Sequence, residues 1–226
     1  MSEPDAITLG ADLVVAVGRL RALHTLSART RSAYPPRGRE ADVADVALAR
    51  AEEGVGALLR LFPEGPGLHA VPRVQIGLTG RWLIEGCALF TWIAEDPATR
   101  TKAWMARGAR ERLELLKAAG FNLSPENCEL LEKSAASVPL GEHAQRPGKY
   151  VDAIAEGVNL KSIYAEFCEL SHWNAAWLAA TADDLGDGAW TGHLVILPAF
   201  YRGMIRAAFS MRSIDVDAEL EAIWSL

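Results

Sequence analysis

Cysteine is scarce in this sequence: the 226 residues contain Cys87, Cys128 and Cys168, and none belongs to a Cys-x-x-Cys pair. Three widely spaced cysteines do not form a disulfide framework, so we expect a reducing, cytoplasmic setting. The first ten residues lack the basic and apolar regions of a secretory signal. Uninterrupted apolar runs of about 20 residues, which a membrane span needs, are also missing. These absences predict a soluble, cytoplasmic protein with no membrane partner.

Several catalytic signatures are also absent. The sequence has no glycine-rich phosphate loop, no Gly-x-Ser-x-Gly elbow and no His-Glu-x-x-His motif, which argues against nucleotide hydrolases, serine hydrolases and zincin proteases. The formal net charge is −6, and no basic run follows the pattern expected for contact with a phosphate backbone. Nucleic acid is therefore not expected as a partner. The composition does not predict an oligomeric state.

The most informative stretch present is Arg73 to Asp96, RVQIGLTGRWLIEGCALFTWIAED. It is apolar nearly throughout, but Arg81 and Glu85 interrupt it at its middle, four residues apart and hence on one helical face. An unpaired buried charge is very costly, so two charges in such a run must face water or satisfy one another and their neighbours. We expect them to mark an interior polar site.

Helical periodicity extends over the rest of the chain, and β-branched residues are too dispersed for a sheet. We predict an all-α protein, a single domain over residues 1–226, built as a bundle of about seven or eight helices. Asp96-Pro97 and Ser124-Pro125 are helix start signals. A helix after Leu194 is expected to be kinked or newly begun at Pro198. The helices are predicted over these ranges: Ile7–Leu26, Glu40–Phe62, Arg73–Asp96, Pro97–Ala119, Glu126–Ala136, Val151–Glu156, Leu160–Ala182, Leu194–Met211 and Asp215–Trp224.

A second polar cluster lies in the predicted helix Leu160–Ala182. Tyr164, Cys168 and His172 follow one another at four-residue spacing and share a face, while Glu169 stands three residues before His172. Buried polar groups need partners, so two helices with polar faces in one bundle are expected to turn those faces toward each other. The preferred constellation sets Arg81 and Glu85 against Tyr164 and His172.

These residues resemble a large group of uncharacterised bacterial helical proteins, the family labelled domain of unknown function 5677. The resemblance covers about Val74 to Trp177 and rests on Arg81-Trp-Leu-Ile-Glu85, Trp92, Asp96-Pro97 with Arg100, and Tyr164 through Ser171-His172. It implies a helical fold in which the two segments pair. The family has no settled activity, so the resemblance does not imply a reaction.

A ligand-binding site with acid–base chemistry is the leading functional hypothesis. His172 is the natural proton carrier near neutral pH, with Glu85 or Glu169 orienting it and Arg81 holding a polar or anionic group of a small molecule. Aromatic residues beside a polar group form pocket walls. The residues assigned to binding are Arg81, Trp82, Trp92, Ser171 and Trp173, and those assigned to catalysis are His172, Glu85 and Tyr164. The same groups equally fit a noncatalytic interaction or regulatory protein whose polar network fixes helix register.

A metal site is the second functional hypothesis. Glu169-x-x-His172 has the spacing used in di-iron helical bundles, and Glu85 would add a carboxylate from a facing helix. The sequence holds only one such motif, so a divalent metal as cofactor is an alternative rather than the leading hypothesis. Cys168 and His172 also have a spacing that suits zinc. An inert buried cysteine is the simpler interpretation.

The remaining histidines suggest little chemistry. Arg19 and His24 have the spacing of a helical toxin-type ribonuclease, a further alternative, although the acidic net charge argues against it. His143 and His193 lie near glycine-containing turns and are predicted to be solvated. The segment Ser137–Tyr150 has no apolar period and is predicted to be a surface loop or a flap.

Overall fold

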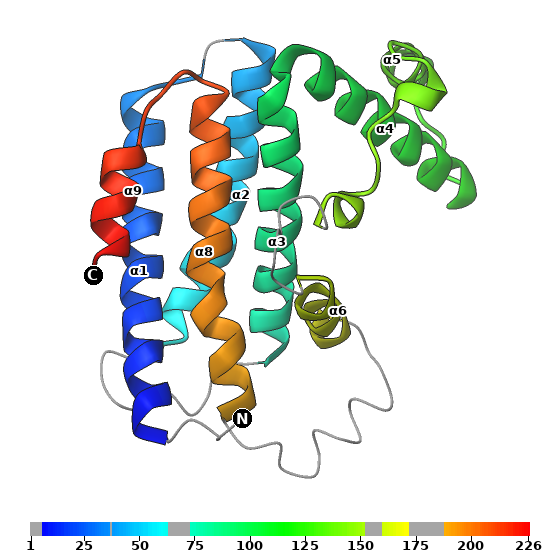
Figure 1. The fold of residues 1–226 in the computed structure, drawn as a ribbon. Coiled ribbons are helices and arrows are strands. Elements are labelled where there is room, and N and C mark those ends of the chain that lie inside the picture. Colours follow the sequence, from blue (N-terminus) through cyan, green and yellow to red (C-terminus); the bar gives the residue numbers. More distant parts are fainter. Residues whose placement is uncertain (1–5, 37, 63–72, 152–159, 172–187) are drawn as a thin grey trace.

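Four long helices lie side by side and enclose the core: α1 (Ala6–Ala33), α2 (Arg39–Arg60), α3 (Arg73–Glu95) and α8 (Gly188–Ser210) (Figure 1). The computed structural model describes residues 6–36, 38–62, 73–151, 160–171 and 188–226. Within these ranges the chain forms eight α-helices and two short 3₁₀ turns and no strand. The predicted all-α bundle is therefore confirmed.

Each long helix contributes fully buried apolar side chains to one core, among them Leu20, Leu48, Ile84 and Tyr201. The periodic spacing of such residues places them on one stripe of each helix, and burying the stripes against one another stabilises the bundle. None of the described helices is long and apolar enough to cross a membrane.

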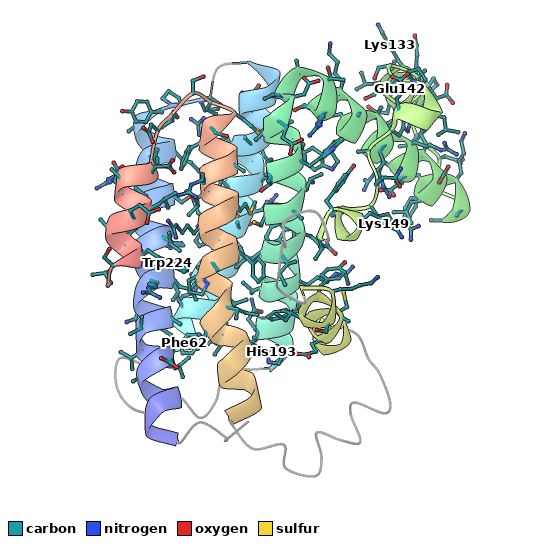
Figure 2. All side chains as sticks on the ribbon, viewed as in Figure 1. Phe62, Lys133, Glu142, Lys149, His193 and Trp224 are labelled. Carbon is teal, nitrogen blue, oxygen red and sulfur yellow. The ribbon has the colours of Figure 1, made fainter. Side chains whose placement is uncertain are left out.

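The helix α4 (Pro97–Ala118) leads away from the upper end of α3 and carries α5 (Pro125–Ala135) on its flank (Figure 1). Both start signals are confirmed, since the Asp96 carboxylate accepts a hydrogen bond from the Thr99 amide and the Ser124 hydroxyl accepts one from the Asn127 amide, each at 3.3 Å. Figure 2 shows Lys133 of α5 and the nearby Glu142 well away from the four long helices.

The first helix does not end at Leu26 as predicted but continues to Ala33. Ser27 and Thr30 are buried in this added part. The Arg31 guanidinium is bound by Asp45 of α2 at 3.0 Å and by Glu52 at 2.6 Å. A polar sequence that looked like a solvated loop is therefore helical, because α2 supplies partners for its side chains.

The helix α8 passes continuously through Pro198, so of the two alternatives expected there, a kink or a new helix start, the new start is wrong. An interior proline costs about 3 kcal/mol in an isolated helix. Here its neighbours Leu197 and Phe200 are buried in the core. Packing of α8 against α1 and α3 therefore offsets the missing backbone hydrogen bond.

The segment Ser137–Tyr150 is held against α3 and α4. It contains two 3₁₀ turns, η1 (Leu140–Glu142) and η2 (Pro147–Lys149). The His143 ring nitrogen Nε2 is 3.2 Å from the Ala135 carbonyl oxygen and 3.0 Å from that of Val138, so His143 is not simply solvated as predicted. The Tyr150 ring stacks on Trp92 of α3 with centroids 4.6 Å apart.

The last helix, α9 (Asp217–Trp224), is fastened to the bundle through an aromatic ring. The Trp224 ring lies under the guanidinium groups of Arg19 and Arg202, at 4.6 and 4.8 Å from the ring centroid (Figure 2). Arg19 also donates a hydrogen bond to the Trp224 carbonyl oxygen at 2.6 Å. His24 is half-buried and lies beside Gly56 of α2. Arg19 and His24, the pair behind the ribonuclease alternative, thus contact different neighbours.

A very close helix contact in the core joins α3 to α8. A methyl group added to Gly86 would lie 2.7 Å from the Met204 sulfur, and one added to Gly203 would lie 2.5 Å from the Cys87 sulfur. Cys87 is consequently buried, and burial raises the pKa of its thiol to about 11 even though a hydrogen bond with Thr91 opposes the shift.

This raised pKa predicts a specific loss of stability at high pH. The thiol stays neutral in the folded chain up to pH about 11, whereas its ordinary pKa of 9.0 applies after unfolding. Ionisation then favours the unfolded chain, so stability falls as pH rises from about 9 to about 11, by about 2 to 3 kcal/mol in total. Urea unfolding at pH 8 to 11 tests this against Cys87→Ala, which should lack that part of the fall. Parallel pH profiles for the two proteins would contradict it.

Candidate functional site

Arg81 and Glu85 form an ion pair on α3. The Arg81 Nε atom donates to Glu85 Oε1 at 3.0 Å, as the four-residue spacing on a helix allows. The Arg81 side chain is 34 % exposed and the Glu85 side chain 19 %. The pair therefore lies at the edge of the bundle and not deep inside it. The pKa of Arg81 is raised, chiefly by its hydrogen bond to Glu85, so the guanidinium stays charged.

A third polar group reaches this pair from α6 (Leu160–Ser171). The Tyr164 hydroxyl donates a hydrogen bond of 2.5 Å to Glu85 Oε1, across 79 positions of sequence. Burial, the bond to Glu85 and the neighbouring Cys168 all raise the pKa of Tyr164. The phenol therefore stays protonated at neutral pH and serves as a donor to the carboxylate.

The position of α6 depends on the absence of a side chain at Gly80 of α3. Phe167 is fully buried against Gly80, where a methyl group would lie 2.7 Å from the ring atom Cζ and closer still to two other ring carbons. Tyr164 lies one turn before Phe167 on α6. Docking of Phe167 at Gly80 therefore sets the place of the phenol.

A histidine that the sequence did not single out also fixes α6. His193 of α8 lies edge-on to the Phe167 ring, with centroids 5.2 Å apart, and its Nε2 atom is 2.7 Å from the Glu166 carboxylate (Figure 2). The sequence predicted a solvated side chain here. No local pattern could have shown this contact, since Glu166 and His193 are 27 positions apart.

A pocket of about 520 Å³ lies beside Glu85 and is bounded mainly by α2, α3 and α4; we call it the larger pocket because it exceeds the one that adjoins it. A separate pocket of about 560 Å³ lies between α1 and α9, away from Glu85. The walls of the larger pocket are mainly apolar, with Trp82 and Phe90 from α3 and Trp104 from α4. Its charged lining groups are Glu85, Asp42 and Arg50. The other lining residues are Val43, Val46, Ala47, Gly86, Leu89, Met105, Pro147 and Met204.

A second, smaller pocket of about 340 Å³ adjoins it. Arg81, Gln75 and Thr79 line this pocket but not the larger one, whereas Trp82 and Glu85 line both. The Trp82 side chain is 43 % exposed. An indole and a carboxylate therefore form the shared wall of an apolar space and a more polar one.

The structure does not bring all the sequence-derived candidates to these pockets. Trp92 lines neither of them and instead stacks on Tyr150 beneath the Arg100 guanidinium. Ser171 is the last described residue of α6. His172 and Trp173 lie outside the described residues, as do the rest of the predicted helix to Ala182 and all of the predicted helix Val151–Glu156 except Val151.

The metal hypothesis depends mainly on groups that the structure does not describe. Among the side chains that the structure does describe, no group of three or more His, Cys, Asp and Glu is arranged to hold a metal ion. Glu85 is bound by Arg81 and Tyr164, while the Glu169 side chain and His172 are not among the described groups.

The pocket walls from α2 and α4 could not be recognised in the sequence. Val46 follows the apolar period of α2, yet it is 60 % exposed at the larger pocket. Met105 of α4 lines the same pocket. Periodicity marks an apolar face but does not show whether a neighbouring helix covers it.

Comparisons with protein families, curated proteins and solved structures do not assign this chain to a family. No family model matches the chain, and neither a curated protein nor a solved structure matches it.

Proposed function

We propose that this protein binds a small, mainly apolar molecule in the larger pocket, with the polar group of that molecule directed at Glu85. The observation behind the proposal is a concave apolar space of about 520 Å³ with a positioned carboxylate in its wall. Ligand pockets are typically of this size, and a few fixed polar groups in an apolar lining orient the ligand.

Glu85 is suited to such a role because its position is already fixed. Arg81 and Tyr164 hold the same oxygen, Oε1, from two different helices. A ligand donor would meet the other oxygen, Oε2, without the cost of ordering a free side chain. Arg81 stands at the smaller pocket, where it would face a polar part of a ligand that extends past Trp82.

A tryptophan placed at the mouth of the larger pocket should block binding. Val46 lines the pocket while 60 % exposed, so Val46→Trp fills the entrance with a change in unfolding free energy of only about 0.5 kcal/mol. We expect at least about a tenfold weaker affinity for the neutral fluorescent probe N-phenyl-1-naphthylamine, since the pocket loses most of its apolar contact area.

The matched control is Val14→Trp on α1, because Val14 is 67 % exposed and lines none of the described pockets. It should bind the probe as the unsubstituted protein does. Equal affinities for both tryptophan variants, or no binding of the probe by any of the three proteins, would contradict the proposal.

A further inference from the structure

We infer that the ligand of the larger pocket is a lipophilic cation, with an apolar or aromatic body that carries a quaternary ammonium or protonated amine group. This inference rests on the proposed function and adds the charge of the ligand to it. It is drawn from the aromatic residues of the pocket and from the placement of the charged groups around it.

The aromatic walls are the first part of the argument. Trp82 and Trp104 line the pocket with Phe90, and the Phe90 and Trp104 rings meet edge to face at 5.9 Å, which fixes their orientation. The faces of tryptophan and phenylalanine rings attract a cation, and the attraction grows when water is excluded. A neutral ligand gains only from burial at such walls, whereas a cation gains from both effects.

The sign of the charge is the second part. Two carboxylates, Asp42 and Glu85, line the larger pocket, against one cation, Arg50. Arg50 is bound to Glu53 at 2.8 Å, which offsets its charge. Arg81 lines the smaller pocket and not the larger, and its Nε atom is directed at Glu85. The Arg50–Glu53 and Arg81–Glu85 pairs each balance, so Asp42 leaves the surroundings of the larger pocket with one net negative charge, which favours a cation over an anion.

The depth of Glu85 is the third part. Its side chain is only 19 % exposed, so its attraction for a bound charge is screened by water less than that of a surface carboxylate. Tyr164 and Arg81 hold it in place, which favours a bulky cation that contacts the carboxylate without needing a directed hydrogen bond.

Two isosteric probes test the inference. (2-Naphthylmethyl)trimethylammonium and its neutral carbon isostere, 2-(2,2-dimethylpropyl)naphthalene, differ only in a nitrogen and its charge. Their dissociation constants are measured by displacement of N-phenyl-1-naphthylamine, with 2-naphthylacetate as the anionic comparison. We expect the ammonium compound to bind about tenfold more tightly than the carbon isostere, and the acetate to bind most weakly.

A pair of variants tests whether the Glu85 carboxylate causes the preference for the ammonium compound. Glu85→Gln should reduce the difference between the ammonium compound and its isostere to about threefold or less. Glu114→Gln removes the same charge from α4, where Glu114 is exposed and paired with Arg110, and should leave the preference unchanged. An equal loss in both variants would overturn the role of Glu85.

The outcomes separate the two proposals. If the neutral isostere binds as tightly as the ammonium compound, or the acetate binds best, the inference of a cation is wrong while the proposed pocket stands. If no probe binds, the proposed function itself fails. The comparison between isosteres uses the unsubstituted protein, so it decides the matter even if Glu85→Gln does not fold.

Discussion

Replacing Gly80 with alanine is expected to lower the free energy of unfolding by about 3 kcal/mol. The added methyl group would lie 2.7 Å from Phe167 Cζ and nearer to two further ring atoms. Phe167 of α6 is fully buried against Gly80 of α3 and the ring of His193, so its rigid ring cannot move without shifting α6. Overpacking of a core costs about 1 to 3 kcal/mol, and lost burial of the ring adds to it.

Thermal unfolding measures this effect, and a chain of this length should melt about 6 to 12 °C lower. Gly108→Ala on α4 is the control, because a methyl group at Gly108 meets nothing within 4 Å. Alanine there should raise stability by about 0.5 to 1 kcal/mol through its better helix propensity. An unchanged melting temperature for Gly80→Ala would show that α6 does not dock on α3 through Phe167.

Replacing Arg31 with methionine is expected to cost about 2 to 3 kcal/mol. The guanidinium binds both oxygens of Asp45 at 3.0 Å and Glu52 at 2.6 Å, which joins α1 to α2. The Asp45 and Glu52 side chains are only 17 % and 11 % exposed. Methionine keeps the length of the side chain but leaves two poorly hydrated carboxylates without their main partner, and such a loss is strongly destabilising.

The contrast with an exposed ion pair makes this prediction sharp. Arg50 and Glu53 are 2.8 Å apart on α2, but their side chains are 61 % and 64 % exposed. Arg50→Met should therefore change stability by less than about 1 kcal/mol. Urea unfolding of both variants gives the comparison. Similar costs for the two substitutions would mean that the Arg31 network does not hold α1 to α2.

Structural features that depend only on residues close together in the sequence could be predicted. The caps at Asp96 and Ser124 each involve an amide three positions away, so their residue types were enough to place two helix starts. The end of the first helix was not predictable in this way. Its last two turns depend on Arg31, whose partners Asp45 and Glu52 lie 14 and 21 positions further along.

The candidate site likewise combines features that could be predicted from the sequence with features that could not. Two charges in an apolar stretch require partners, and this requirement is enough to single out Arg81, Glu85 and a second polar helix from the amino-acid sequence. The pocket itself could not be predicted. It depends on the direction in which α4 leaves the upper end of α3 (Figure 1), and on the α2 face at Val46, which stays partly uncovered. Acid–base chemistry by His172, a metal at Glu169 and the resemblance to the domain of unknown function 5677 stay predictions.

A crystal structure of the protein soaked with (2-naphthylmethyl)trimethylammonium tests the binding site most directly. We expect density for the naphthalene ring between α2 and α3 against Trp82, with the ammonium group nearest Glu85 and the Tyr164 hydroxyl still bound to Oε1. Density for the compound only outside this pocket, with Trp82 and Glu85 untouched, would contradict the proposed function.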